Sequence, residues 1–297
     1  MQLRTDLALE NREFVGDKLP KGVAEDFYNY GDTKITKIEI LDKNGEKALG
    51  KPIGKYITVE MAPFYKSAES DQKIEAVAKE LCTIIPEEGS ALVVGLGNTE
   101  ITPDSLGPLT ASQVLATRHI KGEIARSTGL EGMRPVSVLF PGVLGQTGME
   151  TREILFAVKK EIKPDFIIAV DAMASRSVSR LGCTVQMSNT GIIPGSGVGN
   201  SRPRICTETI GVPVISIGIP TVVNSSVLFY DTALSSGLGY DDAEKIYQKS
   251  ENTLENMTVT PREIDLLIQR ASRLLSLALN TALHREFSVR DFQMLLS

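Results

Sequence analysis

Two aspartates of this 297-residue chain occupy positions from which paired carboxylates could do acid–base chemistry. Asp104 follows the apolar run 92–94 after a glycine-rich turn, and Asp171 ends the apolar run 167–170. Short apolar runs rich in β-branched residues are typical of strands that are buried on both faces. Ligands of open α/β sheets bind beyond the carboxyl ends of such strands. We therefore expect both side chains to face one crevice.

A shared crevice would give the two aspartates different protonation states. Two carboxyl groups at close range do not both ionise readily, so their pKa values separate and one group stays protonated near neutral pH. Such a pair can activate a water molecule and polarise a carbonyl group. Asp104 and Asp171 can each fill either role on the sequence alone. The competing interpretation for either residue is a cap on the helix that follows it.

Few other residues offer a nucleophile and a base. His119 follows a predicted helix and His284 ends one, positions at which histidine is usually structural. Cys82, Cys183 and Cys206 lie far apart without a C-x-x-C pair, so neither a disulfide framework nor a zinc site is indicated. The G-x-S-x-G and H-E-x-x-H motifs are absent from the sequence. We expect no metal and no cofactor.

Two glycine-rich segments suggest weaker alternatives. Residues 45–51 match most of the P-loop pattern, but Pro52 replaces the required Ser or Thr and the flanking segments resemble strands, which favours a hairpin turn. Residues 195–200 could form a nest of backbone N–H groups that binds an anion, or a flexible loop. A nucleoside- or anion-binding α/β protein without enzymatic activity is therefore one alternative function.

Strands and helices alternate through the middle of the chain. This alternation predicts an α/β fold with a mainly parallel sheet flanked by helices on both faces. The predicted strands are 91–96, 135–140, 166–170, 183–187 and 212–217, and the predicted helices between them are 106–117 and 149–162. No linker or internal repeat divides the chain, so one domain is expected.

The two ends of the chain differ from this alternation. Residues 1–34 have weak periodicity and are predicted to be an irregular arm, whereas 35–41 and 55–61 are predicted to form a hairpin with a turn signal at 43–45. A strong helix start, with a Thr cap, Pro at the first position and Glu three residues after the cap, begins at Thr260. The predicted C-terminal and flanking helices are 67–85, 241–256 and 260–283.

Composition excludes two classes of partner. The net charge of −5 and the lack of a basic run argue against direct binding to nucleic acid. No apolar run approaches the roughly 18 residues of a membrane span, and the N-terminus has no apolar core of a signal peptide. We expect a cytoplasmic protein without a membrane partner.

Several motifs in a consistent order resemble the germination protease family of spore-forming bacteria, over most of the chain. They are Gly95–Asn98, Thr102–Pro108, Phe140–Val143, Val170–Ala172, Gly218–Val223 and Val259–Asp265. The resemblance implies an aspartic-type endopeptidase that degrades small acid-soluble spore proteins in the spore core during germination. It also implies a homotetramer and an α/β fold related to the hydrogenase maturation peptidases. The family's two essential aspartates would correspond to Asp104 and Asp171.

The resemblance further implies a zymogen that removes its own N-terminal segment. Thr5–Glu10 resembles the family's substrate site, at which cleavage follows Glu, so the bond between Glu10 and Asn11 is predicted to be cut. Residues 1–10 would then be a propeptide and 11–297 a single peptidase domain. The chain is shorter between 230 and 260 than the family pattern.

Selection of a glutamate would require a cation. Arg176, Arg202 and Arg204 lie in predicted loops near the proposed site and are the candidates for binding the substrate. The nearest alternative function is a metal-dependent peptidase of the hydrogenase-maturation type. Those proteins add a histidine ligand, and neither His119 nor His284 stands at a predicted strand end.

Overall fold

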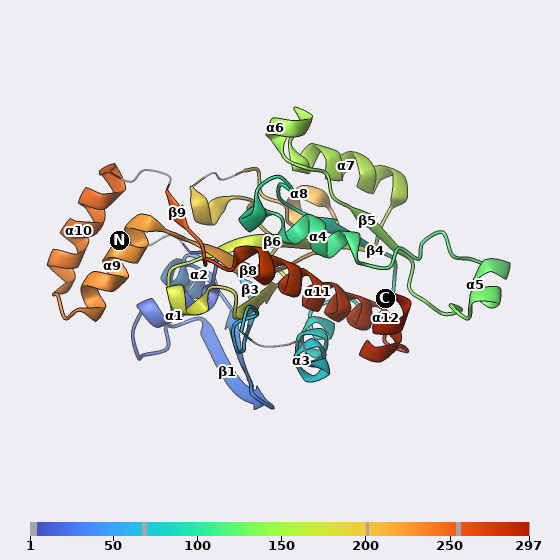
Figure 1. Ribbon diagram of the computed structural model, residues 1–297, viewed down its shortest axis with the longest axis horizontal. Helices are drawn as coiled ribbons and strands as arrows, with labels where there is room; N and C mark the ends of the chain where they lie inside the picture. Colours follow the sequence, from blue (N-terminus) through green and yellow to red (C-terminus); the bar gives the residue numbers. More distant parts are fainter. Residues whose placement is uncertain (1–4, 67–69, 200–201, 254–256, 297) are drawn as a thin grey trace.

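A mixed β-sheet with helices on both faces forms the centre of the protein (Figure 1). The computed structural model describes residues 5–66, 70–199, 202–253 and 257–296. The strand order is β1-β2-β3-β7-β8-β6-β4-β5, and β9 pairs with β8. The strands are β1 Val23–Tyr30, β2 Thr33–Ile40, β3 Gly54–Glu60, β4 Ala91–Gly95, β5 Val136–Leu139, β6 Phe166–Ser175, β7 Thr184–Ser188, β8 Val214–Asn224 and β9 Thr258–Val259.

The inner part of the sheet is parallel, as the alternation of strands and helices predicts. β4 pairs with β5 and β6, and β6 pairs with β8, all in the parallel sense. Every residue of β4 is buried, and nearly every residue of β6 and β8 is buried too. Apolar side chains fill both faces of these strands, which is why they appear in the sequence as continuous apolar runs.

The other part of the sheet is antiparallel, and here two predictions are wrong. Within the predicted irregular arm 1–34, the described residues 5–34 contain α1 (Ala8–Phe14) and β1. Most of β1 faces solvent, so it lacks the apolar alternation by which a half-buried strand is recognised. β2 and β3 pair as the predicted hairpin, but a helix, α2 (Lys43–Leu49), connects them instead of a turn. The Asp42 carboxylate caps α2 by accepting from two backbone N–H groups.

Helices cover the two faces of the sheet through separate apolar clusters. On one face α11 packs against α3 and α4, and Leu274, Leu275 and Ala278 of α11 are buried there. On the other face Leu155 of α7 and Ile210 of α8 pack against the sheet. The helices of the described residues include α3 Asp71–Cys82, α4 Leu106–Ser112, α5 Glu123–Thr128, α6 Leu144–Thr147, α7 Thr151–Ile162, α8 Thr207–Ile210, α9 Ser225–Ser235, α10 Tyr240–Thr253, α11 Ile264–Leu283 and α12 Val289–Leu295.

The ends of several elements differ from the sequence-based predictions. β6 and β8 continue past the apolar runs by which they were predicted, so Asp171 lies within β6 and not at its end. α11 begins at Ile264, and the Thr260 hydroxyl donates a hydrogen bond to the Thr221 carbonyl instead of capping a helix. The predicted helices 67–85 and 241–256 correspond to α3 and α10, and their residues 67–69 and 254–256 lie outside the described residues.

The remaining helices lie at the periphery. α9 and α10 pack together through Tyr230 and Tyr247 at one end of the molecule, and α5 lies at the opposite end (Figure 1). In the described part of the chain, no helix combines the length and the apolar character that a membrane crossing requires.

Candidate active site

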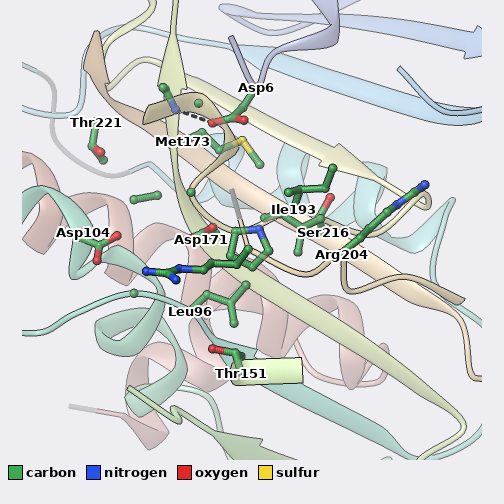
Figure 2. Close-up of a pocket in the computed structure, with 18 of the residues that line it drawn as sticks. Asp6, Leu96, Asp104, Thr151, Asp171, Met173, Ile193, Arg204, Ser216 and Thr221 are labelled. Atoms are coloured by element: carbon green, nitrogen blue, oxygen red, sulfur yellow. Dashed lines mark hydrogen bonds between the residues drawn. The ribbon is translucent and has the colours of Figure 1, made fainter. Parts of the chain in front are cut away.

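A cavity of about 880 Å³ opens where η1 (Thr102–Asp104), β6 and the loops after them meet. Asp104 and Asp171 both line it, together with Asp6 from the N-terminal segment (Figure 2). The three carboxyl groups come from positions far apart in the sequence. The fold therefore brings the two aspartates of the sequence analysis to one site, and adds a third carboxylate.

Asp171 occupies the deepest position of the pair. It is 6% exposed and pairs with Gly218 of β8 across the parallel ladder. A Cβ atom at Gly218 would lie 2.2 Å from the Asp171 carbonyl oxygen, so only glycine fits there. Burial raises the pKa of Asp171 well above its ordinary value, and the neighbouring charges of Asp104 and Asp6 raise it further.

Asp104 is held in place by a tight 3₁₀ turn that follows β4. Its Oδ2 atom accepts a hydrogen bond of 2.8 Å from the Asn98 backbone N–H, and the Thr221 hydroxyl of β8 donates to the Pro103 carbonyl at 2.8 Å. Gly97 has φ +119°, and a Cβ atom there would lie 2.0 Å from the Asp104 carbonyl oxygen. Burial raises the pKa of Asp104, and the Asn98 hydrogen bond partly opposes this.

These environments separate the two carboxyl groups in their readiness to ionise. Asp171 is enclosed and has two acidic neighbours, whereas Asp104 is partly exposed and its charged form receives a backbone hydrogen bond. The arrangement thus favours a protonated Asp171 beside an ionised Asp104. A pair in these states can supply one general acid and one general base.

The three arginines of the sequence analysis are not equally placed. Arg202 and Arg204 line the cavity, and Arg204 donates to the Thr190 carbonyl at 3.0 Å. Arg176 does not line it, because its guanidinium pairs with Asp231 at 3.0 Å. The structure therefore brings two of the three arginine side chains to the site.

The N-terminal segment lies along β6 and enters the cavity with Asp6. The Asp6 backbone N–H donates to the Ala174 carbonyl at 3.0 Å, and the Ala174 N–H donates to the Asp6 Oδ2 atom at 2.8 Å. The Ser196 hydroxyl donates to Asp6 Oδ1 at 2.7 Å. The glycine-rich loop that was a candidate anion site is therefore in contact with a carboxylate of its own chain.

The carbonyl oxygen of Asp6 accepts two hydrogen bonds from side chains that the sequence analysis did not select. Lys51 Nζ lies 3.0 Å from it and Gln186 Nε2 lies 2.8 Å from it. Gln186 also accepts from the Ala8 backbone N–H at 2.6 Å. Burial lowers the pKa of Lys51. The position of a glutamine between Val185 and Met187 in a predicted buried strand was the available signal for Gln186, whereas Lys51 had only the incomplete P-loop pattern.

Glu10 is bound outside the cavity. Its side chain is buried and accepts hydrogen bonds from the backbone N–H groups of Arg176 and Ser177, at 2.7 and 2.9 Å. Arg180 Nη1 lies 3.4 Å from Glu10 Oε1. The Glu10–Asn11 bond, predicted to be cut, lies inside α1.

The histidines lie away from this site. His119 is exposed, and His284 is buried beside Phe292 in the C-terminal region. Neither lines the cavity. Among the described residues, no group of three or more His, Cys, Asp or Glu side chains is arranged to hold a metal ion.

The fold and the site define an α/β protein with two carboxyl groups on one cavity beside the parallel strands of a mixed sheet. The sequence model described as "Germination protease" matches residues 6–236. The chain is 42% identical to the germination protease of Caldanaerobacter subterraneus subsp. tengcongensis, over 99% of this chain and 98% of that protein. It belongs to the germination protease family and is a spore protease.

Other relatives agree with this assignment. The germination protease of Clostridium tetani is 39% identical over 98% of both chains, and that of Priestia megaterium is 36% identical over 98% of this chain and 96% of that protein. The family match ends at residue 236, so most of the short region 230–260 lies beyond it. Among solved structures, one match is the NiFe hydrogenase maturation protease HycI of Thermococcus kodakarensis. The match covers 68% of this chain and 98% of the HycI chain, with 18% identity and a TM-score of 0.38.

Proposed function

We propose that this spore protease is an aspartic-type endopeptidase in which Asp104 and Asp171 catalyse hydrolysis of the peptide bond. The observation that supports the proposal is the position of both carboxyl groups on one cavity, in environments that favour different protonation states. In this mechanism ionised Asp104 takes a proton from a water molecule while the water oxygen bonds to the carbonyl carbon of the substrate. Protonated Asp171 gives its proton to the leaving amide nitrogen as the C–N bond breaks.

Membership of the germination protease family supports a proposal for the substrates. We propose small acid-soluble spore proteins, cut after glutamate in the spore core during germination, and a homotetrameric enzyme without a cofactor. Incubating the purified protein with a peptide that contains Thr-Glu-Phe-Ala-Ser-Glu, followed by sequencing of the products, tests this. Cleavage after a glutamate is the expected result, and an intact peptide would contradict the proposal.

N-terminal self-processing is a second part of the proposal. Cleavage at the predicted Glu10–Asn11 bond requires α1 to unwind, because the bond lies inside that helix. The Asp6–Leu7 bond needs no such change to meet the cavity, since Asp6 already lines it. Intact-mass analysis after activation distinguishes the two bonds, as loss of residues 1–10 or of residues 1–6. An unchanged N-terminus would contradict self-processing.

The two alternatives from the sequence analysis receive less support. A metal-dependent peptidase of the hydrogenase-maturation type would need a histidine ligand, and neither His119 nor His284 lines the cavity. Cleavage that is insensitive to chelators would exclude it. In a nucleoside- or anion-binding protein the loop 195–199 would be free for a ligand, whereas Ser196 binds Asp6. A nucleotide thermal-shift screen beside the cleavage assay would separate the two functions.

A further inference from the structure

A carboxylate-binding cradle follows β6 directly in the chain. It consists of the backbone N–H groups of Arg176 and Ser177 and the guanidinium group of Arg180, and we call it the glutamate cradle. It holds the side chain of Glu10, which is 3% exposed, at 2.7, 2.9 and 3.4 Å, respectively. The Thr5 hydroxyl also donates to this carboxylate. Two backbone donors and one cation form a complete, charge-assisted site for a carboxylate.

The guanidinium group of the cradle is itself fixed by acidic neighbours. Arg180 Nη2 lies 2.6 Å from Glu13 and its Nε atom lies 3.6 Å from Glu60. The Arg180 side chain is 13% exposed, while that of Glu13 is 52% exposed. Arg180 therefore holds one orientation toward the buried Glu10, and the outer pair with Glu13 lies at the surface.

Between the cavity and the cradle, the backbone of the N-terminal segment is bound in the way that a protease binds a peptide. Asp6 pairs with Ala174 of β6, and Gln186 of β7 both donates to the Asp6 carbonyl and accepts from the Ala8 N–H. Lys51 donates to the Thr5 and Asp6 carbonyls. Backbone hydrogen bonds of this kind give affinity for an extended segment, and pockets for its side chains give specificity.

We propose that this groove is the substrate-binding groove, that the glutamate cradle is its subsite for a substrate glutamate, and that residues 5–10 occupy the groove in competition with substrate. The ligand is a peptide with an acidic residue followed four positions later by glutamate, the pattern of residues 5–10 themselves. The proposal rests on the proposed peptidase function. It assigns recognition of the glutamate side chain to Arg180 and two backbone N–H groups, and not to the side chains of Arg176, Arg202 or Arg204.

A binding experiment tests the proposal without requiring turnover. The probe is a fluorescein-labelled peptide that copies residues 3–12, and its anisotropy is measured with the full-length chain carrying Asp171→Asn to prevent cleavage. Replacing Glu10 with Gln in the chain releases the internal competitor from the cradle. We expect this variant to bind the peptide at least 10-fold more tightly than the chain with Glu10. Unchanged affinity would overturn the proposal.

The identity of the cradle is tested by changing the peptide. A peptide whose glutamate corresponding to Glu10 is Gln should bind the Glu10→Gln chain about 10- to 100-fold more weakly, the loss expected for one charge-assisted interaction. Adding Arg180→Met to the chain should remove this discrimination, and Arg180→Lys should restore part of it. Equal binding of both peptides before any change at Arg180 would overturn the proposal, even if the Arg180 variants fail to fold.

Asp17 supplies the control. It lies on the exposed surface shortly after α1 and takes no part in the contacts of the cradle. The Asp17→Asn chain should bind the peptide like the unchanged chain, because Glu10 still fills the cradle. An equal gain of affinity in both variants would show a general loosening of the N-terminal segment and contradict the proposal. If the chain does not distinguish the Glu peptide from the Gln peptide but the protein still hydrolyses its substrate, the cradle alone is rejected. If the chain distinguishes the two peptides but the protein does not hydrolyse the substrate, only the peptidase function is rejected.

Discussion

At the scale of single residues, Asp171 lies deeper than Asp104 and has two acidic neighbours, and both features raise its pKa. Its raised pKa means that the folded state keeps a proton that the unfolded chain has released. The free energy of unfolding contributed by Asp171 therefore falls as pH rises from about 4, the ordinary Asp value, toward the raised value. Asp171 thus destabilises the fold at neutral pH, which is consistent with the catalytic role that we propose for it.

This pH dependence of stability predicts how the Asp171→Asn variant behaves. Asp171→Asn removes the ionisable group and should leave the melting temperature at pH 8 equal to or above that of the unchanged protein. The difference should shrink as pH falls toward 4, since both side chains are then neutral. Melting curves between pH 4 and 8 measure this. A variant that becomes progressively less stable than the unchanged protein as pH rises would contradict the raised pKa.

His284 has the opposite pH dependence. Burial, with a contribution from the Arg134 charge, lowers its pKa to about 4, and neither ring nitrogen has a hydrogen-bond partner among the described residues. The unfolded chain takes up the proton at about pH 6.5, so stability is lost as pH falls from there to about 4. His284→Leu removes this loss. Its effect on the free energy of unfolding should therefore be more favourable at pH 4 than at pH 7, by up to roughly 3 kcal/mol. Denaturant titrations at both pH values check this, and a pH-independent difference would contradict it.

Some residues of the site could be predicted from the sequence and others could not. Asp104 and Asp171 follow apolar runs that predict neighbouring buried strands, so their approach was foreseeable. Arg180 and Lys51 contact Glu10 and Asp6, more than forty residues away in sequence, in an N-terminal segment whose apolar residues show only weak periodicity. Their roles depend on where that segment packs, which no local signal specifies.

At the scale of elements, the site depends on how closely α4 and η1 approach β4 and β6. Gly107, in the first turn of α4, contacts backbone on two sides. A Cβ atom there would lie 2.1 Å from the Leu96 carbonyl oxygen and 2.5 Å from the Val170 carbonyl oxygen. The glycines of the motif that follows β4 are therefore needed for this approach, which brings Asp104 close to the strand that carries Asp171.

Gly107→Ala tests that dependence. Because both contacts are backbone atoms that cannot rotate away, we expect a loss of roughly 2–4 kcal/mol in the free energy of unfolding and a reduced peptidase rate. Gly239→Ala is the matched control, since Gly239 also has an ordinary backbone conformation and no atom lies within 4 Å of its added Cβ. Denaturant unfolding of both variants gives the comparison. Similar stability of the two would contradict the close approach.

The sheet shows which elements a sequence pattern reveals. The parallel strands β4, β6 and β8 are buried on both faces and were predicted from their apolar runs. Their ends were not, because β6 continues past Asp171 and β8 continues past Gly218 and Pro220, residues that usually mark the end of a strand. β1 was missed because most of its side chains face solvent. It is held in the sheet by its antiparallel pairing with β2 and not by buried side chains.

At the scale of the whole molecule, the family resemblance implies four copies of the chain. Large apolar side chains remain exposed on the single chain, among them Phe27, Phe156 and Tyr240, and are candidates for burial in an assembly. Light scattering coupled to gel filtration should give four times the chain mass of 32.2 kDa. A mass equal to one chain across the accessible concentration range would contradict the tetramer.

The most direct test of the account is the cleavage rate of the Thr-Glu-Phe-Ala-Ser-Glu peptide by the unchanged protein and by Asp104→Asn and Asp171→Asn. Removing either half of a general acid–base pair should lower kcat/KM by at least about 100-fold, with the circular dichroism spectrum unchanged. Asp241→Asn, on the exposed surface of α10, should retain the full rate. Turnover within a few-fold of the unchanged protein in either cavity variant would contradict catalysis by the two aspartates.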